Sequence, residues 1–208
     1  MLLLLLGLVL SLALAQKLYP EEIVEQDFNM TRAAGSWSSI SLASDNVMWI
    51  GVNGDLHLFI RTIELLLNSS LLFHFRFWMQ GECVFVTVVC EKTPKNAEFS
   101  TVYRGENKVL ILETDYWMYI IFYLKNVRFG IETQVLALYG RIPVLSDPLL
   151  DRFEKAYRKY GMGPRNTINL AEKGGLPCSP GPAEAGLGPG RGPSSSSGSL
   201  ASPDLCQY

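Results

Sequence analysis

Long apolar runs are scarce in this chain. One covers residues 1–15, and no second run of about 18 residues follows, the minimum for a membrane-spanning helix. The first run closes with Ala13-Leu14-Ala15 before the polar Gln16. A short apolar segment that ends in a small-x-small tripeptide is typical of a secretory signal peptide. We therefore expect a secreted, extracellular protein that begins at Gln16 and has no membrane span.

Excess charge of one sign is also absent. The chain has 18 Lys and Arg against 20 Asp and Glu, and no basic stripe, which argues against nucleic acid as a partner. Histidine is limited to His57 and His74, which alternation places on the outward face of adjacent strands with no Cys or His cluster around them. Two imidazoles alone rarely form a metal site. We expect no metal and no cofactor.

The four cysteines are candidates for disulfide bonds, because a secreted protein passes through an oxidising compartment that favours them. The residues alone do not decide how Cys83, Cys90, Cys178 and Cys206 pair. Secretion also makes two N-glycosylation sequons usable, at Asn29 and Asn68. Asn68 is the better candidate because it lies in a polar break between two strand-like runs, whereas Asn29 lies close to an expected strand.

Composition divides the mature chain into two parts. Residues 179–208 are rich in Pro, Gly, Ser and Ala without periodicity. Such a stretch buries too little apolar surface to offset its ordering entropy, so we expect a disordered tail. Residues 16–178 have the length of one domain.

Turn residues at intervals cut this domain into short strands, which favours a sandwich or a closed barrel. The turn signals are Asn53-Gly54, Asn68-Ser69-Ser70, Gln80-Gly81, Pro94-Lys95-Asn96, Gly105-Glu106-Asn107 and Phe129-Gly130. Asp147-Pro148 then begins an amphipathic pattern that Gly161 ends, typical of one helix with Asp147 as its cap. Ile168 and Leu170 suit a short closing strand.

Alternation within the strands assigns an interior face. Phe59 falls on the opposite, outward face together with His57. The same pattern fits a packed core or a hollow one, and a small barrel is wide enough for either. If the interior is hollow, the Tyr139 hydroxyl could orient a ligand carbonyl or alcohol. The candidate ligand-binding residues are Leu56, Leu58, Ile60, Phe73, Phe75, Val86, Val88, Phe122, Leu124, Val135 and Tyr139.

Three short motifs bracket the strands: Gly35-Ser36-Trp37, Thr114-Asp115-Tyr116 and Arg141. Their order and spacing resemble the lipocalins. The resemblance implies an all-β fold, an eight-stranded antiparallel up-and-down barrel with one C-terminal helix packed outside. It also implies that Trp37 seals the closed end, that Arg141 packs across its ring, and that Gly35, Thr114, Asp115 and Tyr116 shape the same end.

The resemblance extends to function. It implies a secreted carrier of a small lipophilic molecule, of the fatty acid, retinoid, steroid or odorant class, and a disulfide between Cys83 and Cys178. Four segments look most like the urinary-protein and odorant-carrier branch, and especially the epididymal lipocalins, which implies male reproductive tract fluid. They are Ala43-Ser44-Asp45, Glu91-Lys92-Thr93, Leu138-Tyr139-Gly140-Arg141 and residues 166–170.

Two other functions remain to be weighed. Val47-Met48-Trp49-Ile50 is an unusually apolar loop, which suits a lid over the mouth or a surface for a cell-surface receptor, as in a protein-interaction module with a filled barrel. An enzyme would need an activated thiol, and Cys90 is the candidate on a strand. No neighbouring cation is identifiable that would lower its pKa, so we expect no catalysis.

Overall fold

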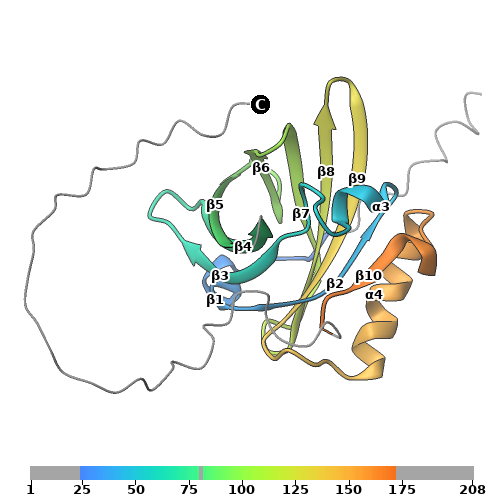
Figure 1. Cartoon of the computed structure of the whole chain (residues 1–208). Coiled ribbons are helices and arrows are strands. Elements are labelled where there is room, and N and C mark those ends of the chain that lie inside the picture. Colours follow the sequence, from blue (N-terminus) through green and yellow to red (C-terminus); the bar gives the residue numbers. More distant parts are fainter. Residues whose placement is uncertain (1–23, 80–81, 172–208) are drawn as a thin grey trace, which may run out of the picture.

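The computed structural model describes residues 24–79 and 82–171, which form one strongly curved antiparallel sheet with a helix against its outer surface (Figure 1). The strands are β1 (Gly35–Ser36), β2 (Ser38–Ser44), β3 (Phe59–Leu65), β4 (Leu71–Met79), β5 (Glu82–Lys92), β6 (Glu98–Val102), β7 (Glu106–Thr114), β8 (Tyr119–Arg128), β9 (Ile131–Gly140) and β10 (Thr167–Asn169). The helices are α2 (Met30–Ala33), α3 (Val47–Ile50), α4 (Asp147–Lys159) and the 3-10 turn η1 (Pro164–Asn166).

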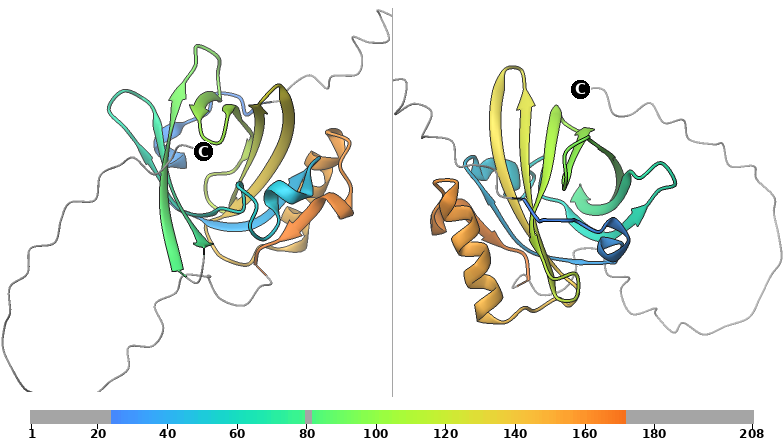
Figure 2. Two further views of the ribbon diagram at one scale, coloured as in Figure 1. Left: turned by 45° about the horizontal axis from the view of Figure 1, so that its top comes forward. Right: turned by 180° about the vertical axis from the view of Figure 1, so that it is seen from behind.

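One continuous segment joins the two edges of this sheet. From β3 to β9 each strand pairs with the next along the chain. β1 and β2 are separated only by Trp37, yet β1 pairs with β3 and β2 pairs with β9. With β1 and β2 counted as one strand and β10 set aside, eight strands therefore wrap around a common axis (Figure 2). The expected all-β, up-and-down antiparallel architecture is confirmed.

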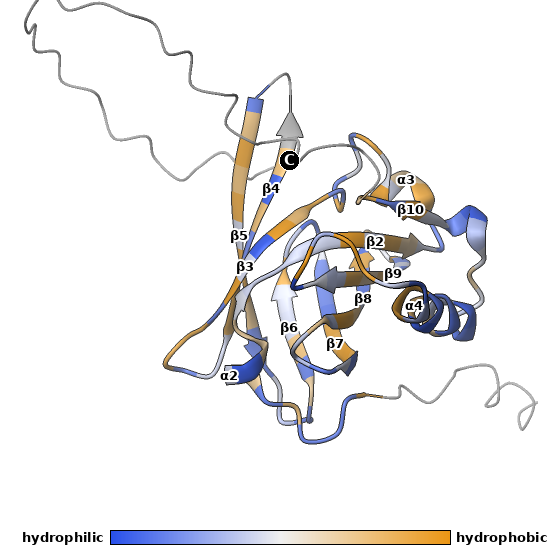
Figure 3. Ribbon diagram, turned by 90° about the horizontal axis from the view of Figure 1, so that it is seen from below, coloured by the Kyte–Doolittle hydropathy of each residue, from blue (hydrophilic) through white to orange (hydrophobic). Residues whose placement is uncertain are grey.

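The sheet has an apolar face on each side. On β8, Ile120 and Phe122 point into the barrel, whereas Ile121 and Tyr123 belong to a second cluster with α4. Phe153 and Tyr157 of α4 are buried in that second cluster. Figure 3 shows α4 beside β9 with hydrophilic residues on the side away from the sheet. The expected single C-terminal helix outside the barrel is therefore confirmed.

The helix begins one residue earlier than the sequence suggested. Ser146 is the N-cap, and Asp147 lies in the first turn, where its charge complements the helix dipole. Asp147 as the cap was therefore wrong. Gly161 follows the helix with a φ of +76°, a left-handed conformation that favours glycine and ends the helix.

Three expectations near the open end were wrong in detail. Residues 47–50 form the helical turn α3 rather than a loop, because the Asn46 side chain accepts a hydrogen bond from the Met48 amide at its start. His57 lies in the loop before β3 and not on a strand, and its Nδ1 is 2.6 Å from the Ile50 carbonyl oxygen. Phe59 is buried rather than outward-facing, because it packs edge-on against His57 at the entrance to the strand.

Trp37 and Arg141 pack against each other at the closed end of the barrel. The Arg141 guanidinium lies over the Trp37 ring, 3.8 Å from its centroid, a contact worth about 1–2 kcal/mol when shielded from water. The Trp37 indole N–H donates to the Ala33 carbonyl at 2.8 Å. Gly35 has a φ of +112°, and a Cβ there would lie 2.9 Å from Arg141 Nη1, so the close approach needs glycine.

Arg141 also ties separate segments together through backbone carbonyls. Its Nη2 donates to Arg32 and Ala34, its Nη1 to Ser36 and its Nε to Tyr116, at 2.8–3.2 Å. Five N–H donors in a fixed plane suit such a set of acceptors.

The loop after β7 has its own internal support. The Asp115 carboxylate accepts hydrogen bonds from the amides of Trp117, Met118 and Tyr119. The Thr114 hydroxyl donates to the Tyr119 carbonyl at 2.7 Å and accepts from the Tyr116 amide. The structure thus brings all three sequence motifs to one end of the barrel.

Some expectations fall on residues outside those described. These are the signal peptide at residues 1–15, the turn at Gln80-Gly81, the tail at residues 179–208, and Cys178 and Cys206. Among residues 24–79 and 82–171, no helix is long and apolar enough to cross a membrane.

Replacing Trp37 with Ala should lower the free energy of unfolding by about 3–5 kcal/mol, since it removes a buried aromatic side chain and the surface on which Arg141 rests. Urea denaturation measures the change. Trp117→Ala is the matched control, because Trp117 is 74% exposed and its loss should cost less than about 0.5 kcal/mol. Equal stability of the two variants would contradict the assigned role of Trp37.

Candidate functional site

The interior of the barrel contains a partly open cavity of about 90 Å³. Its walls come from β2 and from β4 to β9, together with the loop that precedes β3. Most of the lining side chains are aliphatic or aromatic. An apolar cavity with few polar groups is the usual form of a small-molecule site.

Nine of the eleven candidate ligand-binding residues line this cavity. They are Leu56, Leu58, Phe73, Phe75, Val88, Phe122, Leu124, Val135 and Tyr139. Ile60 does not: it is 1% exposed and packs in the core just before a bulge in β3 at Arg61. Val86 does not line it either: it is partly buried and packs against the interior core cluster. Ile60 and Val86 thus lie outside the cavity lining.

The cavity also includes residues that the sequence did not single out. Val109 and Asn107 follow the alternation of β7 and could have been found from it, as could Leu42 on β2. Thr101 and Tyr103 lie at the end of the short strand β6, where alternation gives little signal. Cys90 on β5 and Ala137 on β9 also line the cavity.

Aromatic side chains limit the size of the cavity. Phe73 stacks on Phe75 with ring centroids 5.8 Å apart and meets Phe122 edge-on at 5.5 Å. Phe122 in turn lies 5.4 Å from Tyr139. At roughly 10–15 Å³ for each water-sized group, a cavity of about 90 Å³ accommodates about six to nine such groups. The geometry suits a compact molecule.

Tyr139 places a hydroxyl among these apolar groups. Burial raises its pKa above the usual tyrosine range, so the group remains a neutral donor at physiological pH. None of the hydrogen bonds within the described part of the chain uses this hydroxyl. It is therefore available to a bound molecule.

Cys90 has a free thiol at the same level of the barrel. Burial raises its pKa to about 12, which leaves the thiol protonated at neutral pH. Because the thiolate is the nucleophile, this environment disfavours covalent catalysis. Within residues 24–79 and 82–171, no group of three or more His, Cys, Asp or Glu side chains is arranged to hold a metal ion.

The barrel wall has a side groove between β5 and β6. These two strands pair only at Glu91 with Ser100 and at Lys92 with Phe99. Above these pairs lies a groove of about 800 Å³, and its lining includes Val88 and Tyr103, which also line the interior cavity. The groove and the interior cavity are therefore separated here by shared wall residues.

Comparison with protein families gives a match over residues 34–174, to the lipocalin / cytosolic fatty-acid binding protein family. The chain belongs to the lipocalin family. Among curated relatives, it is 55% identical to mouse epididymal-specific lipocalin-9 over 172 residues, covering 83% of this chain and 96% of the relative. The human protein of that name is 46% identical over 86% of this chain and 92% of its own. Mouse major urinary protein 4 is 37% identical over 71% and 82%.

Solved lipocalin structures have the same fold. Odorant Binding Protein OBP1 superposes with a TM-score of 0.66 at 25% identity, over 71% of this chain and 96% of that one. The possum milk whey lipocalin trichosurin, solved with bound 4-ethylphenol, gives 0.65 at 26% identity, over 68% and 98%. The expected kinship with epididymal lipocalins and with urinary and odorant carriers is thus confirmed.

The pKa of Cys90 gives a test of its burial in this lipocalin. A thiol whose pKa rises from 9.0 to about 12 on folding stabilises the fold fully below pH 9 and loses that contribution as pH rises toward 12. The loss should be about 1.4 kcal/mol per pH unit in this window. Urea denaturation at pH 8 and at pH 10 should therefore show a smaller decrease for Cys90→Ala than for the wild type. Parallel decreases would contradict the burial of this thiol.

Proposed function

We propose that this lipocalin is a secreted carrier that binds one compact hydrophobic molecule inside its barrel. The observation that carries the proposal is the interior cavity of about 90 Å³, with apolar walls and a buried tyrosine hydroxyl. Binding would remove apolar surface from water on both partners, which is favourable without any directional contact. A carrier, and not an enzyme, agrees with the protonated state of the Cys90 thiol.

The size of the cavity ranks the candidate ligand classes by how well they fit. Odorant-sized molecules match it best, whereas fatty acids, retinoids and steroids would need Phe73 and Phe75 to move. The 4-ethylphenol bound to trichosurin supports a ligand of this size with one hydroxyl. We therefore place a small phenol or alcohol first.

The names of the relatives support a site of action for this carrier. The name epididymal-specific lipocalin-9, shared by relatives 55% and 46% identical, supports secretion into male reproductive tract fluid. Asn29 and Asn68 are both exposed, in keeping with glycosylation of either sequon. A disulfide between Cys83 and Cys178 remains part of the proposal, as a link between the chain beyond the helix and the barrel wall.

A protein-interaction function is the second candidate, because α3 presents an apolar surface. Met48 is 81% exposed and Val47 is 40% exposed, while Trp49 and Ile50 pack inward. Exposed apolar groups at a rim suit contact with a cell-surface receptor. Binding to a receptor becomes the first candidate function if the barrel binds no small molecule.

Isothermal titration calorimetry should find saturable one-to-one binding of 4-ethylphenol. Burying the equivalent of about eight methylenes stabilises the complex by about 6 kcal/mol, a Kd of tens of micromolar. Palmitate, retinol and a steroid should bind more weakly or not at all. If folded protein binds none of these compounds, the carrier function is wrong and the receptor function takes its place.

Replacing Tyr139 with Phe should distinguish the contribution of its hydroxyl group to ligand affinity from the contribution of apolar packing. The variant loses one hydrogen bond, so 4-ethylphenol should bind about 2- to 12-fold more weakly. 4-Ethyltoluene, with a methyl in place of the hydroxyl, should bind both proteins equally. Tyr157→Phe, in α4 outside the barrel, is the matched control and should change neither affinity. An equal loss for both ligands would show that Tyr139 acts through packing alone.

A further inference from the structure

The loop between β2 and β3 crosses the open end of the barrel as a compact unit. The Leu56 amide donates to the Trp49 carbonyl at 2.9 Å, and the His57 amide donates to the Gly54 carbonyl at 3.0 Å. A Cβ on Gly54 would lie 2.3 Å from the Trp49 carbonyl oxygen, so this close packing needs glycine. Leu56 and Leu58, at the end of the loop, line the cavity. Moving this loop would therefore remove part of the cavity wall.

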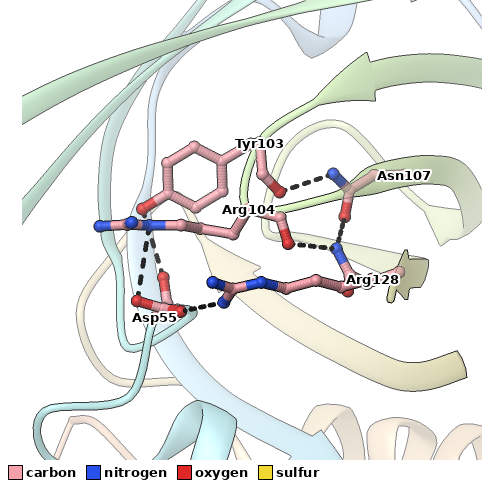
Figure 4. Close-up of polar contacts among 6 residues, drawn as sticks. Asp55, Tyr103, Arg104, Asn107 and Arg128 are labelled. Atoms are coloured by element: carbon pink, nitrogen blue, oxygen red, sulfur yellow. Dashed lines mark hydrogen bonds and ion pairs between the residues drawn. The ribbon is translucent and has the colours of Figure 1, made fainter. Parts of the chain in front are cut away.

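Asp55 fastens this loop to two hairpins on the other side of the mouth (Figure 4). Its Oδ2 lies 3.0 Å from Arg128 Nη1 at the end of β8, and its Oδ1 lies 3.5 Å from Arg104 Nε in the β6–β7 turn. The Tyr103 hydroxyl donates to the Asp55 carbonyl oxygen at 3.2 Å. Asp55 is adjacent to Leu56, so these contacts bear directly on a cavity-lining residue.

Two buried amides hold the cationic side of this arrangement in place. Asn107 Nδ2 donates to the carbonyls of Tyr103 at 2.8 Å and Gly105 at 2.9 Å. Asn126 Nδ2 donates to Asn107 Oδ1 at 2.8 Å and to the Arg104 carbonyl at 3.3 Å. Asn126 is fully buried and Asn107 is 6% exposed. These hydrogen bonds fix the turn that carries Arg104 independently of its contact with Asp55.

We propose that Asp55 is a latch that sets the rate at which the barrel exchanges its ligand. The proposal rests on the carrier function. With Asp55 bound to Arg104 and Arg128, Leu56 and Leu58 stay in the cavity wall and narrow the mouth. When those contacts break, the loop swings as a unit and opens it. The side chains are partly exposed, at 35% for Asp55, 39% for Arg104 and 28% for Arg128, so dissolved salt should weaken the latch.

The experiment measures exchange of 4-fluorophenol by fluorine NMR line shapes. Asp55→Asn keeps the shape of the side chain and removes its charge. We expect release about 5- to 30-fold faster than in the wild type, from two partly exposed ion pairs and a weakened loop contact. Raising the salt concentration from about 20 mM to about 500 mM should speed release from the wild type and have little effect on the variant.

Glu132→Gln is the matched control. Glu132 forms a 2.7 Å ion pair with Lys125 on the β8–β9 hairpin without touching the loop, so its loss should leave the release rate unchanged. The charge swap Asp55→Arg with Arg128→Asp should slow release again relative to Asp55→Asn. Equal release rates in the wild type and Asp55→Asn would overturn the proposal and direct attention to the groove between β5 and β6 as the route of exchange.

A second readout keeps the latch separate from the carrier function. Hydrogen–deuterium exchange of the amides at residues 49–58 needs no ligand, and Asp55→Asn should speed it while leaving the strand amides of β8 unchanged. If no phenol binds, the carrier function is wrong, and the hydrogen–deuterium exchange rates alone test whether Asp55 holds the loop in place. Unchanged exchange at residues 49–58 would overturn it.

Discussion

Closure of the sheet through a single segment is the constraint on which the rest of this structure depends. An up-and-down sheet has two open edges, and unpaired edges invite aggregation. Residues 35–44 pair with β3 on one side of Trp37 and with β9 on the other, so one bend brings both edges together. Arg141 holds that bend by covering the Trp37 ring and by donating to the carbonyls of Ala34 and Ser36, which lie just before it in the chain.

Closure also determines what the interior can be. The inward faces of the strands are apolar, so the space they enclose excludes charged groups, and the buried hydroxyl of Tyr139 and thiol of Cys90 stay protonated. Phe73 and Phe122 reach across this space and meet edge-on, which reduces a hollow barrel to a small cavity. The choice between a filled core and a ligand site is thus set by the packing of a few aromatic rings, which alternation alone does not reveal.

The sequence predicts this structure well where its patterns are local and poorly where distant residues meet. Phe73, Phe122 and Tyr139 were assigned to the interior from a period of two, and their strands are regular. The pattern failed around β3, because a bulge at Arg61 and an irregular approach to the strand change which side chains face inward. Asp55 gave no signal at all: Arg128 is 73 positions away, and each residue alone looks like a surface charge. Only the fold shows that their loops meet.

At both ends of the barrel, arginine side chains join separate segments, but the contacts differ in their exposure to solvent. We expect the closed end to contribute to the stability of the barrel and the mouth to control the rate of ligand exchange. At the closed end, the half-buried Arg141 guanidinium rests on a tryptophan ring that is 3% exposed, so the ring side of the contact is shielded from solvent. At the mouth, Arg104 and Arg128 meet a carboxylate that solvent reaches, and an ion pair of that kind contributes little to stability and is screened by salt. A carrier needs both properties: a wall that does not open and a mouth that does. This difference between the two ends suits the proposed carrier, which would have to keep its shape while it exchanges a ligand.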